Sequence, residues 1–181
     1  VIHTGDYTYE DGERPGRVRQ HRGGEIFAVV DYRNRYALYK SDPDLMAAHA
    51  SAPFVVTWDD HEVDNDYAGD RVEHGTPPEV FLVRRAAAYQ AYFETMPLRA
   101  SAVPTGPSMR LHRRLLFGNL IDLNLLDTRQ FRSDQGCGGG WVTNCAAAHD
   151  TNRTMLGNDQ ERWLFDNLAR QSTHQIPQRT A

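Results

Sequence analysis

Asp6 and Tyr9 are the first residues of this chain whose types and spacing could support metal chemistry. They follow a short apolar stretch at residues 1–2 and read as Gly-Asp-x-x-Tyr. A carboxylate can bridge two cations, whereas a neutral phenol, with a pKa of about 10, binds well only beside a cation such as Fe(III) that removes its proton. The pattern suggests a dinuclear hydrolase that uses hard metals. On these residues alone, a Gly-Asp turn with packed tyrosines is the simpler interpretation.

A second segment, residues 54–67, shifts the preference from a simple turn to a metal site. It reads FVVTWDDHEVDNDY, an apolar run typical of a buried strand followed by a dense group of acids. Neighbouring carboxylates repel one another unless cations offset their charge, and their oxygens suit Ca, Mg, Mn or Fe(III). A solvated acidic loop is the alternative. An EF-hand is excluded because, counted from Asp60, the sixth residue is Asn65 rather than Gly and the twelfth is Arg71 rather than Glu.

Together these segments resemble the PhoD-type alkaline phosphatases, relatives of the purple acid phosphatases among the metallophosphoesterases. The matching stretches are HTGDYTYE (3–10), DYRNRYALYKSDPDL (31–45), TWDDHEVDND (57–66), RRAAAYQAYFETMPLR (84–99), LDTRQFRSDQ (126–135) and MLGNDQERWL (155–164). They follow the order of the family along nearly the whole chain. The resemblance implies an enzyme that hydrolyses phosphate esters, as an alkaline phosphatase or phosphodiesterase. It also implies Fe(III) and Ca(II), or other divalent metals, as cofactors.

The resemblance assigns candidate residues to a multi-metal site. It implies that Asp6 bridges two cations and that Tyr9 binds iron as a phenolate. Asp60 falls where relatives with a Gly-Asn-His motif place a metal-binding Asn. His61 would then orient phosphate or stabilise charge, and Asn65 is a rival to Asp60 for a metal or phosphate contact.

Arginines in two later segments are candidates for other roles. Arg84 and Arg85 open the helix expected after the acidic loop, and Arg85 is the candidate to hold a phosphate with two parallel hydrogen bonds. Exposed arginines on a helix surface are the alternative. Asp127 and Arg129 end an apolar run and are interpreted as a structural ion pair.

These residues need alternating strands and helices to position them. Asp42-Pro43 and Thr76 with Glu79 are typical helix starts, the first an N-cap and the second a capping box. We expect strands at residues 1–3, 54–58, 109–117 and 119–126, and helices at 25–40, 42–51, 76–95 and from 158 onward. This order predicts a mixed α/β fold. The resemblance makes it a metallophosphoesterase-like β-sandwich flanked by helices, incomplete in this chain.

Composition limits the remaining possibilities. The 181 residues could hold one domain, and a net charge of −4 gives no signal for nucleic-acid binding. No run of about 18 apolar residues predicts a transmembrane helix. Cys137 and Cys145 flank a short loop that could close as a disulfide, and two free thiols are the alternative. Nothing in the sequence predicts an oligomeric state.

The resemblance also implies further ligands outside this chain. Relatives carry a Ser-Cys-type segment upstream and a Gly-Asp-x-His-type strand end downstream, and neither occurs in residues 1–181. We therefore expect these residues to be an internal fragment of a single domain, inactive and poorly soluble by itself. The family implies an extracytoplasmic location, with the export signal not in this chain. A catalytically inactive metal-binding or interaction module, or a fragment that cannot fold alone, are the alternatives.

Overall fold

A parallel pair of short strands forms the edge at which the two candidate motifs meet. The computed structural model describes residues 1–72, 74–138 and 142–173. Strand β1 (Ile2–His3) pairs in parallel with β2 (Val55–Val56), with Ile2 opposite Val55. Because parallel strands end at the same edge of a sheet, the segments that follow β1 and β2 emerge side by side. Both strands are shorter than expected, since the apolar runs extend beyond the hydrogen-bonded ladder.

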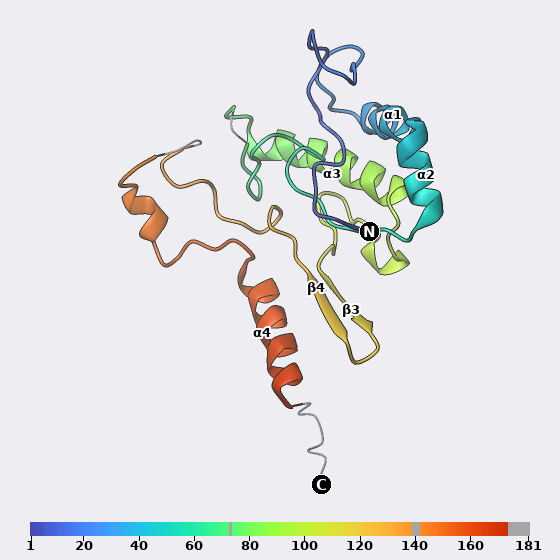
Figure 1. The fold of residues 1–181 in the computed structure, drawn as a ribbon. Helices are drawn as coiled ribbons and strands as arrows, with labels where there is room; N and C mark the ends of the chain where they lie inside the picture. Colours follow the sequence, from blue (N-terminus) through green and yellow to red (C-terminus); the bar gives the residue numbers. More distant parts are fainter. Residues whose placement is uncertain (73, 139–141, 174–181) are drawn as a thin grey trace.

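Three helices pack together beside this pair (Figure 1). They are α1 (Val29–Lys40), α2 (Pro43–Ser51) and α3 (Pro78–Thr95), and α1 packs against both of the others. The Asp42 side chain caps α2 by accepting from the backbone of Asp44 and Leu45, as predicted. The capping box expected at Thr76 is wrong, because Pro77 is the N-cap of α3 and makes no side-chain capping bond.

The core between these helices and β2 is unusually rich in tyrosine. Trp58 is 1% exposed and stacks on Tyr89, with ring centroids 4.2 Å apart. Its indole nitrogen donates to the buried Asp127 carboxylate at 3.0 Å. That carboxylate also accepts from the backbone of Arg129 and Gln130. The core thereby fixes the residues on either side of the acidic loop, since Trp58 directly precedes it.

The remaining elements extend away from the three helices (Figure 1). Strands β3 (Arg113–Phe117) and β4 (Ile121–Leu125) form an antiparallel hairpin, and α4 (Asn158–Thr173) follows. Two short 3-10 helices, Ala100–Ala102 and Ala146–His149, lie in the connections. The prediction of a mixed α/β chain is confirmed at this level. Within the described ranges the strands form two two-stranded sheets.

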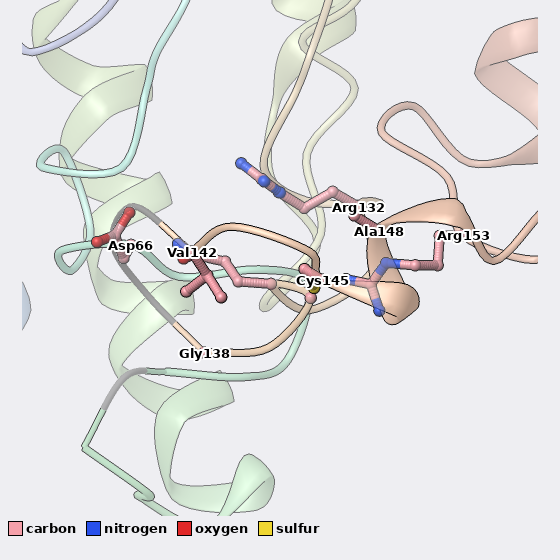
Figure 2. Close-up of a pocket in the computed structure, with 9 residues that line it drawn as sticks. Asp66, Arg132, Gly138, Val142, Cys145, Ala148 and Arg153 are labelled. Carbon is pink, nitrogen blue, oxygen red and sulfur yellow. The ribbon is translucent and has the colours of Figure 1, made fainter.

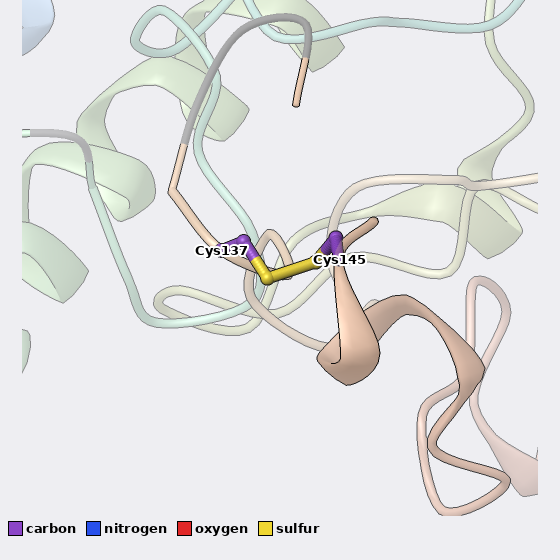
Figure 3. Close-up of a disulfide and its surroundings, with 2 residues drawn as sticks. All are labelled: Cys137 and Cys145. Carbon is purple, nitrogen blue, oxygen red and sulfur yellow. A yellow bond between two sulfur atoms is a disulfide. The ribbon is translucent and has the colours of Figure 1, made fainter. Parts of the chain in front are cut away.

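A disulfide closes the loop before the second 3-10 helix (Figure 3). It joins Cys137 to Cys145, whose Cα atoms are 6.0 Å apart, so the first of the two sequence interpretations holds in the structure. In the described parts of the chain, no helix is both long enough and apolar enough to cross a membrane.

Candidate metal centre

Asp6 reaches the site through an unusual backbone conformation after β1. Gly5 has φ +116° and Asp6 has φ 58°, in the left-handed region that few residues other than glycine adopt. A Cβ on Gly5 would lie 2.3 Å from the backbone nitrogen of Asp59. The chain therefore turns sharply against the loop that follows β2, and this close approach carries the Asp6 carboxylate to that loop.

Asp6, Asp60 and His61 form a cluster that could hold a cation. One ligand atom from each lies within 4.8 Å of the others. Asp6 Oδ1 is buried and has no hydrogen-bond partner among the described residues. Burial raises the pKa of Asp6, and the charges of Asp60 and Asp59 raise it further, against a lowering by His61. A buried carboxylate oxygen without a partner is costly, and a hard cation would supply that partner, so these residues fit such an ion.

Tyr9 lies against the same cluster. Its hydroxyl donates to Asp6 Oδ2 at 3.3 Å, and its ring centroid is 4.3 Å from that of His61. Burial and the Asp6 charge raise the pKa of the Tyr9 phenol, so without a cation it remains neutral. Tyr7, by contrast, packs in the core at 4% exposure and its hydroxyl bonds to His49.

Arg129 is the residue of this site whose role sequence reasoning misjudged. Its Nε lies 2.5 Å from Asp59 Oδ1, its Nη2 3.4 Å from Asp60 Oδ1 and its Nη1 3.9 Å from Asp66 Oδ1. The ion pair expected between the Arg129 and Asp127 side chains is therefore wrong. One guanidinium instead offsets part of the charge of three carboxylates. The stretch LDTRQFRSDQ marks Arg129 as part of a family motif, but it does not indicate which acid Arg129 contacts.

Glu10 is a second residue that the sequence did not single out for the site. It is 4% exposed, with one oxygen 2.8 Å from His61 Nδ1 and the other accepting from the Asn65 backbone at 2.9 Å. Burial alone would lower the pKa of His61. The bond to Glu10 and the charges of Glu10, Asp60 and Asp6 outweigh burial and raise that pKa to about 9. At neutral pH the ring is therefore a cation in the metal-free chain.

The other candidates lie in different surroundings. Asn65 is in the acidic loop, where its amide donates to Asp66 at 3.4 Å. Arg85 is 7% exposed and donates to the carbonyls of Gly69 at 2.6 Å and Pro107 at 2.9 Å. Arg84 is 8% exposed and pairs with Asp64 at 2.8 Å. Neither arginine is the exposed surface residue of the alternative interpretation. The phosphate contacts of Asn65 and Arg85 stay predictions.

An open hollow adjoins the acidic loop on the side of the disulfide (Figure 2). Its volume is about 490 Å³, and Asp66 links it to the cluster because the Asp66 backbone donates to Asp60 at 2.7 Å. Arg132 and Arg153 also line it. The Arg132 Nε is buried and has no hydrogen-bond partner in the part of the chain that the structure describes. A guanidinium in that state can bind an anionic group that enters the hollow.

Comparisons with known proteins find relatives that match nearly the whole of this chain. A family model described as "PhoD-like phosphatase" matches residues 1–176. Over 179 residues the chain is 51% identical to "Alkaline phosphatase D" of Bacillus subtilis (strain 168), covering 96% of this chain and 31% of that protein. A solved chain described as "Structure of PhoD" is 53% identical with a TM-score of 0.89, covering 93% of this chain and 33% of that one. The chain thus spans about a third of the length of these relatives.

Proposed function

This chain belongs to the PhoD-like phosphatase family, and from that premise we propose that it is part of a metal-dependent phosphoric ester hydrolase. The activity is that of an alkaline phosphatase or phosphodiesterase. The observation that carries the proposal is the cluster of Asp6, Asp60 and His61. It gathers the two family motifs around a buried carboxylate oxygen that has no partner among the described residues. The motifs come from opposite ends of a 55-residue stretch, so their convergence is a property of the fold.

The proposed enzyme is longer than these 181 residues and completes a metallophosphoesterase-like β-sandwich with further strands. The coverage of about a third of each relative supports this extent. Apolar side chains on the β3–β4 hairpin also support it, because Leu116 is 61% and Leu120 90% exposed. We refer below to this longer protein as the complete enzyme.

Asp6, Asp60 and Tyr9 would hold the cations, and Fe(III) and Ca(II) are the proposed metals. Carboxylate oxygens suit Ca(II), and a phenol whose pKa is raised binds well only beside a strongly polarising ion such as Fe(III). Such cations, when bound, supply positive charge to phosphoryl oxygens and activate water as a nucleophile. Arg129 holds the Asp59 and Asp60 carboxylates in place through ion pairs.

His61 and the arginines supply the remaining polar groups. As a cation, His61 can donate a hydrogen bond to a phosphoryl oxygen and stabilise the charge that develops there. Asn65 and Arg85 are the further proposed phosphate contacts. Arg132 is an additional candidate, since its Nε at the hollow beside Asp66 is buried and has no partner in the described parts of the chain.

We propose an extracytoplasmic location for the complete enzyme. The disulfide between Cys137 and Cys145 supports this, because disulfides persist in oxidising compartments and are rare where thiols are kept reduced. The location can be tested by fractionating cells that express the complete enzyme. Recovery of the protein only in the cytoplasm would contradict the proposal.

The test of the function compares the complete enzyme with residues 1–181 alone. After both are loaded with Fe(III) and Ca(II), phosphate release is measured from p-nitrophenyl phosphate, and p-nitrophenol release from its bis-ester. We expect turnover only from the complete enzyme, because catalysis needs a closed ligand set around the metals. Metal binding without turnover in the complete enzyme would instead support an inactive metal-binding module.

The phenolate assignment has its own spectroscopic test. Tyr9→Phe should remove or shift a visible absorption band of the iron-loaded complete enzyme, because a phenolate bound to Fe(III) absorbs visible light through charge transfer. Tyr7→Phe is the matched control, since Tyr7 is buried two residues away and bonds to His49. An unchanged spectrum in Tyr9→Phe would remove Tyr9 from the ligand set.

A further inference from the structure

We propose that Glu10 is a positioning residue that fixes the orientation of the His61 ring. Its consequence for catalysis rests on the function proposed above, whereas its effect on the ring does not. Glu10 Oε2 is 2.8 Å from His61 Nδ1, and Oε1 accepts from the Asn65 backbone N–H at 2.9 Å. One buried carboxylate thereby joins the segment after β1 to two positions of the acidic loop.

The geometry leaves one ring nitrogen for the site. Because Nδ1 of His61 is occupied by Glu10, Nε2 is the nitrogen available to a group bound between Asp6 and Asp60. The Tyr9 ring packs against His61 at 4.3 Å between centroids, which restricts rotation about the ring bond. A carboxylate accepts only, so it requires a proton on Nδ1. Histidines at metal sites commonly owe their orientation and tautomer to such a partner.

The double acceptance by Glu10 explains why a carboxylate is needed there. Both oxygens of Glu10 face donors, namely His61 Nδ1–H and the Asn65 backbone N–H. In Glu10→Gln only one oxygen remains. The backbone N–H of Asn65 cannot change its polarity, so the amide oxygen must accept from it and the NH2 group must face Nδ1. The hydrogen bond from Nδ1–H of His61 to Glu10 Oε2 would then be lost, and the ring would no longer be held in this orientation.

Asp11 offers a matched control one residue along the chain. It also lies beside a buried histidine, with Oδ1 3.1 Å from His21 Nδ1, and His21 is 2% exposed. That histidine bonds to Tyr39 through Nε2 and is not part of the Asp6–Asp60–His61 cluster. Asp11→Asn therefore removes a comparable carboxylate charge near a histidine without touching His61.

The first experiment detects the hydrogen bond between His61 and Glu10 directly, in the complete enzyme. Long-range 1H–15N correlation spectra, assigned with His61→Gln, show which ring nitrogens carry protons. We expect a hydrogen-bonded Nδ1–H of His61 in the unmodified protein and in Asp11→Asn, and loss of that hydrogen bond in Glu10→Gln. The proposal is overturned if Nδ1 lacks a proton in the unmodified protein, or if Glu10→Gln leaves the spectrum of His61 unchanged.

The second experiment measures the functional consequence in the complete enzyme. Glu10→Gln should lower kcat by about 10–100-fold, the usual range for a residue that orients a ligand or catalytic histidine, with little change in KM. The double variant Glu10→Gln/His61→Gln should be no slower than His61→Gln alone, because Glu10 acts through the ring. Multiplying losses would instead mark a general structural role and overturn the positioning role.

The two experiments separate the possible failures. If the complete enzyme hydrolyses no phosphate ester, the proposed function fails, and the spectra still decide whether Glu10 holds the His61 ring. Thermal unfolding of each variant provides the last control. A loss of kcat in Glu10→Gln that is matched by Asp11→Asn would show general destabilisation and count against the proposal.

Discussion

Two regions of the chain bury and expose their side chains in opposite ways. One is the pair of loops after β1 and β2, and the other is the β3–β4 hairpin. In the loops, charged groups are drawn inward, with Glu10 4%, Asp60 5% and Glu62 1% exposed. In the hairpin, apolar groups are turned outward, with Phe117 50% and Leu120 90% exposed. Both regions depart from the usual distribution, in which charge is exposed and large apolar groups are buried. Each departure needs its own compensation.

The compensation in the loops is local. Arg129 offsets part of the charge, and Glu62 accepts backbone N–H groups of Tyr7 and Asp59, although burial still raises the pKa of Glu62 to about 7. One carboxylate oxygen of Asp6 remains without a partner in the described chain, which is where a cation fits. Within the described ranges, Phe117 and Leu120 of the hairpin stay largely exposed. Its exposed apolar groups accord with the proposal that further parts of the complete enzyme cover them.

The largest effect that would break this comparison is expected at Asp6. Asp6→Ala should abolish tight cation binding and lower the activity of the complete enzyme by more than about 100-fold. That exceeds the loss of about 10–100-fold usual for removing a residue that only hydrogen-bonds to a metal ligand. Calorimetry with Ca(II) and metal analysis measure the first effect, and phosphate release the second. Asp70→Ala is the control. Asp70 is an acid that follows the acidic loop in the chain, but it is exposed and pairs with Arg71. Unchanged metal content in Asp6→Ala would exclude Asp6 from the site.

The next effect tests whether the loops are held together by the close approach at Gly5. Gly5→Ala places a Cβ 2.3 Å from the Asp59 nitrogen at a backbone φ of +116°, and should lower the free energy of unfolding by roughly 3 kcal/mol. Gly16→Ala separates the two causes, because Gly16 has φ +82° with nothing within 4 Å. Urea unfolding measures both. An equal loss in the two variants would show that the close approach adds nothing.

The sequence indicates that the loops after β1 and β2 meet better than it indicates which side chains pair within them. Asp6 and the acidic loop could be expected to meet, because both follow strands, and parallel strands end at one edge. The partner of Arg129 could not be predicted, since Asp59 lies 70 residues away in the chain and Asp127 only two. Local spacing favours the nearer acid, whereas the tertiary fold directs Asp127 to Trp58.

Burial of charged residues was also beyond the sequence. On α3, the apolar residues Phe81, Ala88 and Tyr92 follow helical spacing and are all at most 1% exposed. Arg84 and Arg85 are buried as well, because Tyr32 and the carbonyls of Gly69 and Pro107 accept from them. Periodicity cannot reveal such acceptors, since they come from other segments of the chain. For the same reason, nothing marked Glu10 as buried.

A smaller effect tests the hairpin. In residues 1–181, Leu120→Lys should change the free energy of unfolding by less than about 0.5 kcal/mol, since this side chain is 90% exposed. In the complete enzyme the same substitution should cost about 1.5–3 kcal/mol if another segment covers Leu120. Urea unfolding of both forms measures the difference. Equal, small effects in both forms would show that no further segment covers Leu120, and that the hairpin is ordinary surface.

The smallest effect concerns Glu94, a surface acid on α3 whose charge is paired with Arg33 on α1. Arg33 Nε lies 2.6 Å from Glu94 Oε2, and the hydrogen bonds from Arg33 and Gln90 lower the pKa of Glu94 from 4.5 to about 2. A depressed carboxyl pKa stabilises the fold above the unfolded value and loses that contribution as pH falls through the folded value. The contribution is therefore present above about pH 4.5 and is lost toward pH 2.

Solvent screens this pair, unlike the inward acids, so its loss should lower the melting temperature by no more than about 2–4 °C. The measurement is the difference between the unmodified chain and Glu94→Gln in melting temperature from pH 7 to pH 2. It should be largest at neutral pH and vanish toward pH 2. Asp159→Asn is the control, because Asp159 is 99% exposed and lies 3.8 Å from Arg162. A difference that persists unchanged at pH 2 would show that Glu94 acts through packing rather than charge, and that surface acids in this chain are not compensated as the inward acids are.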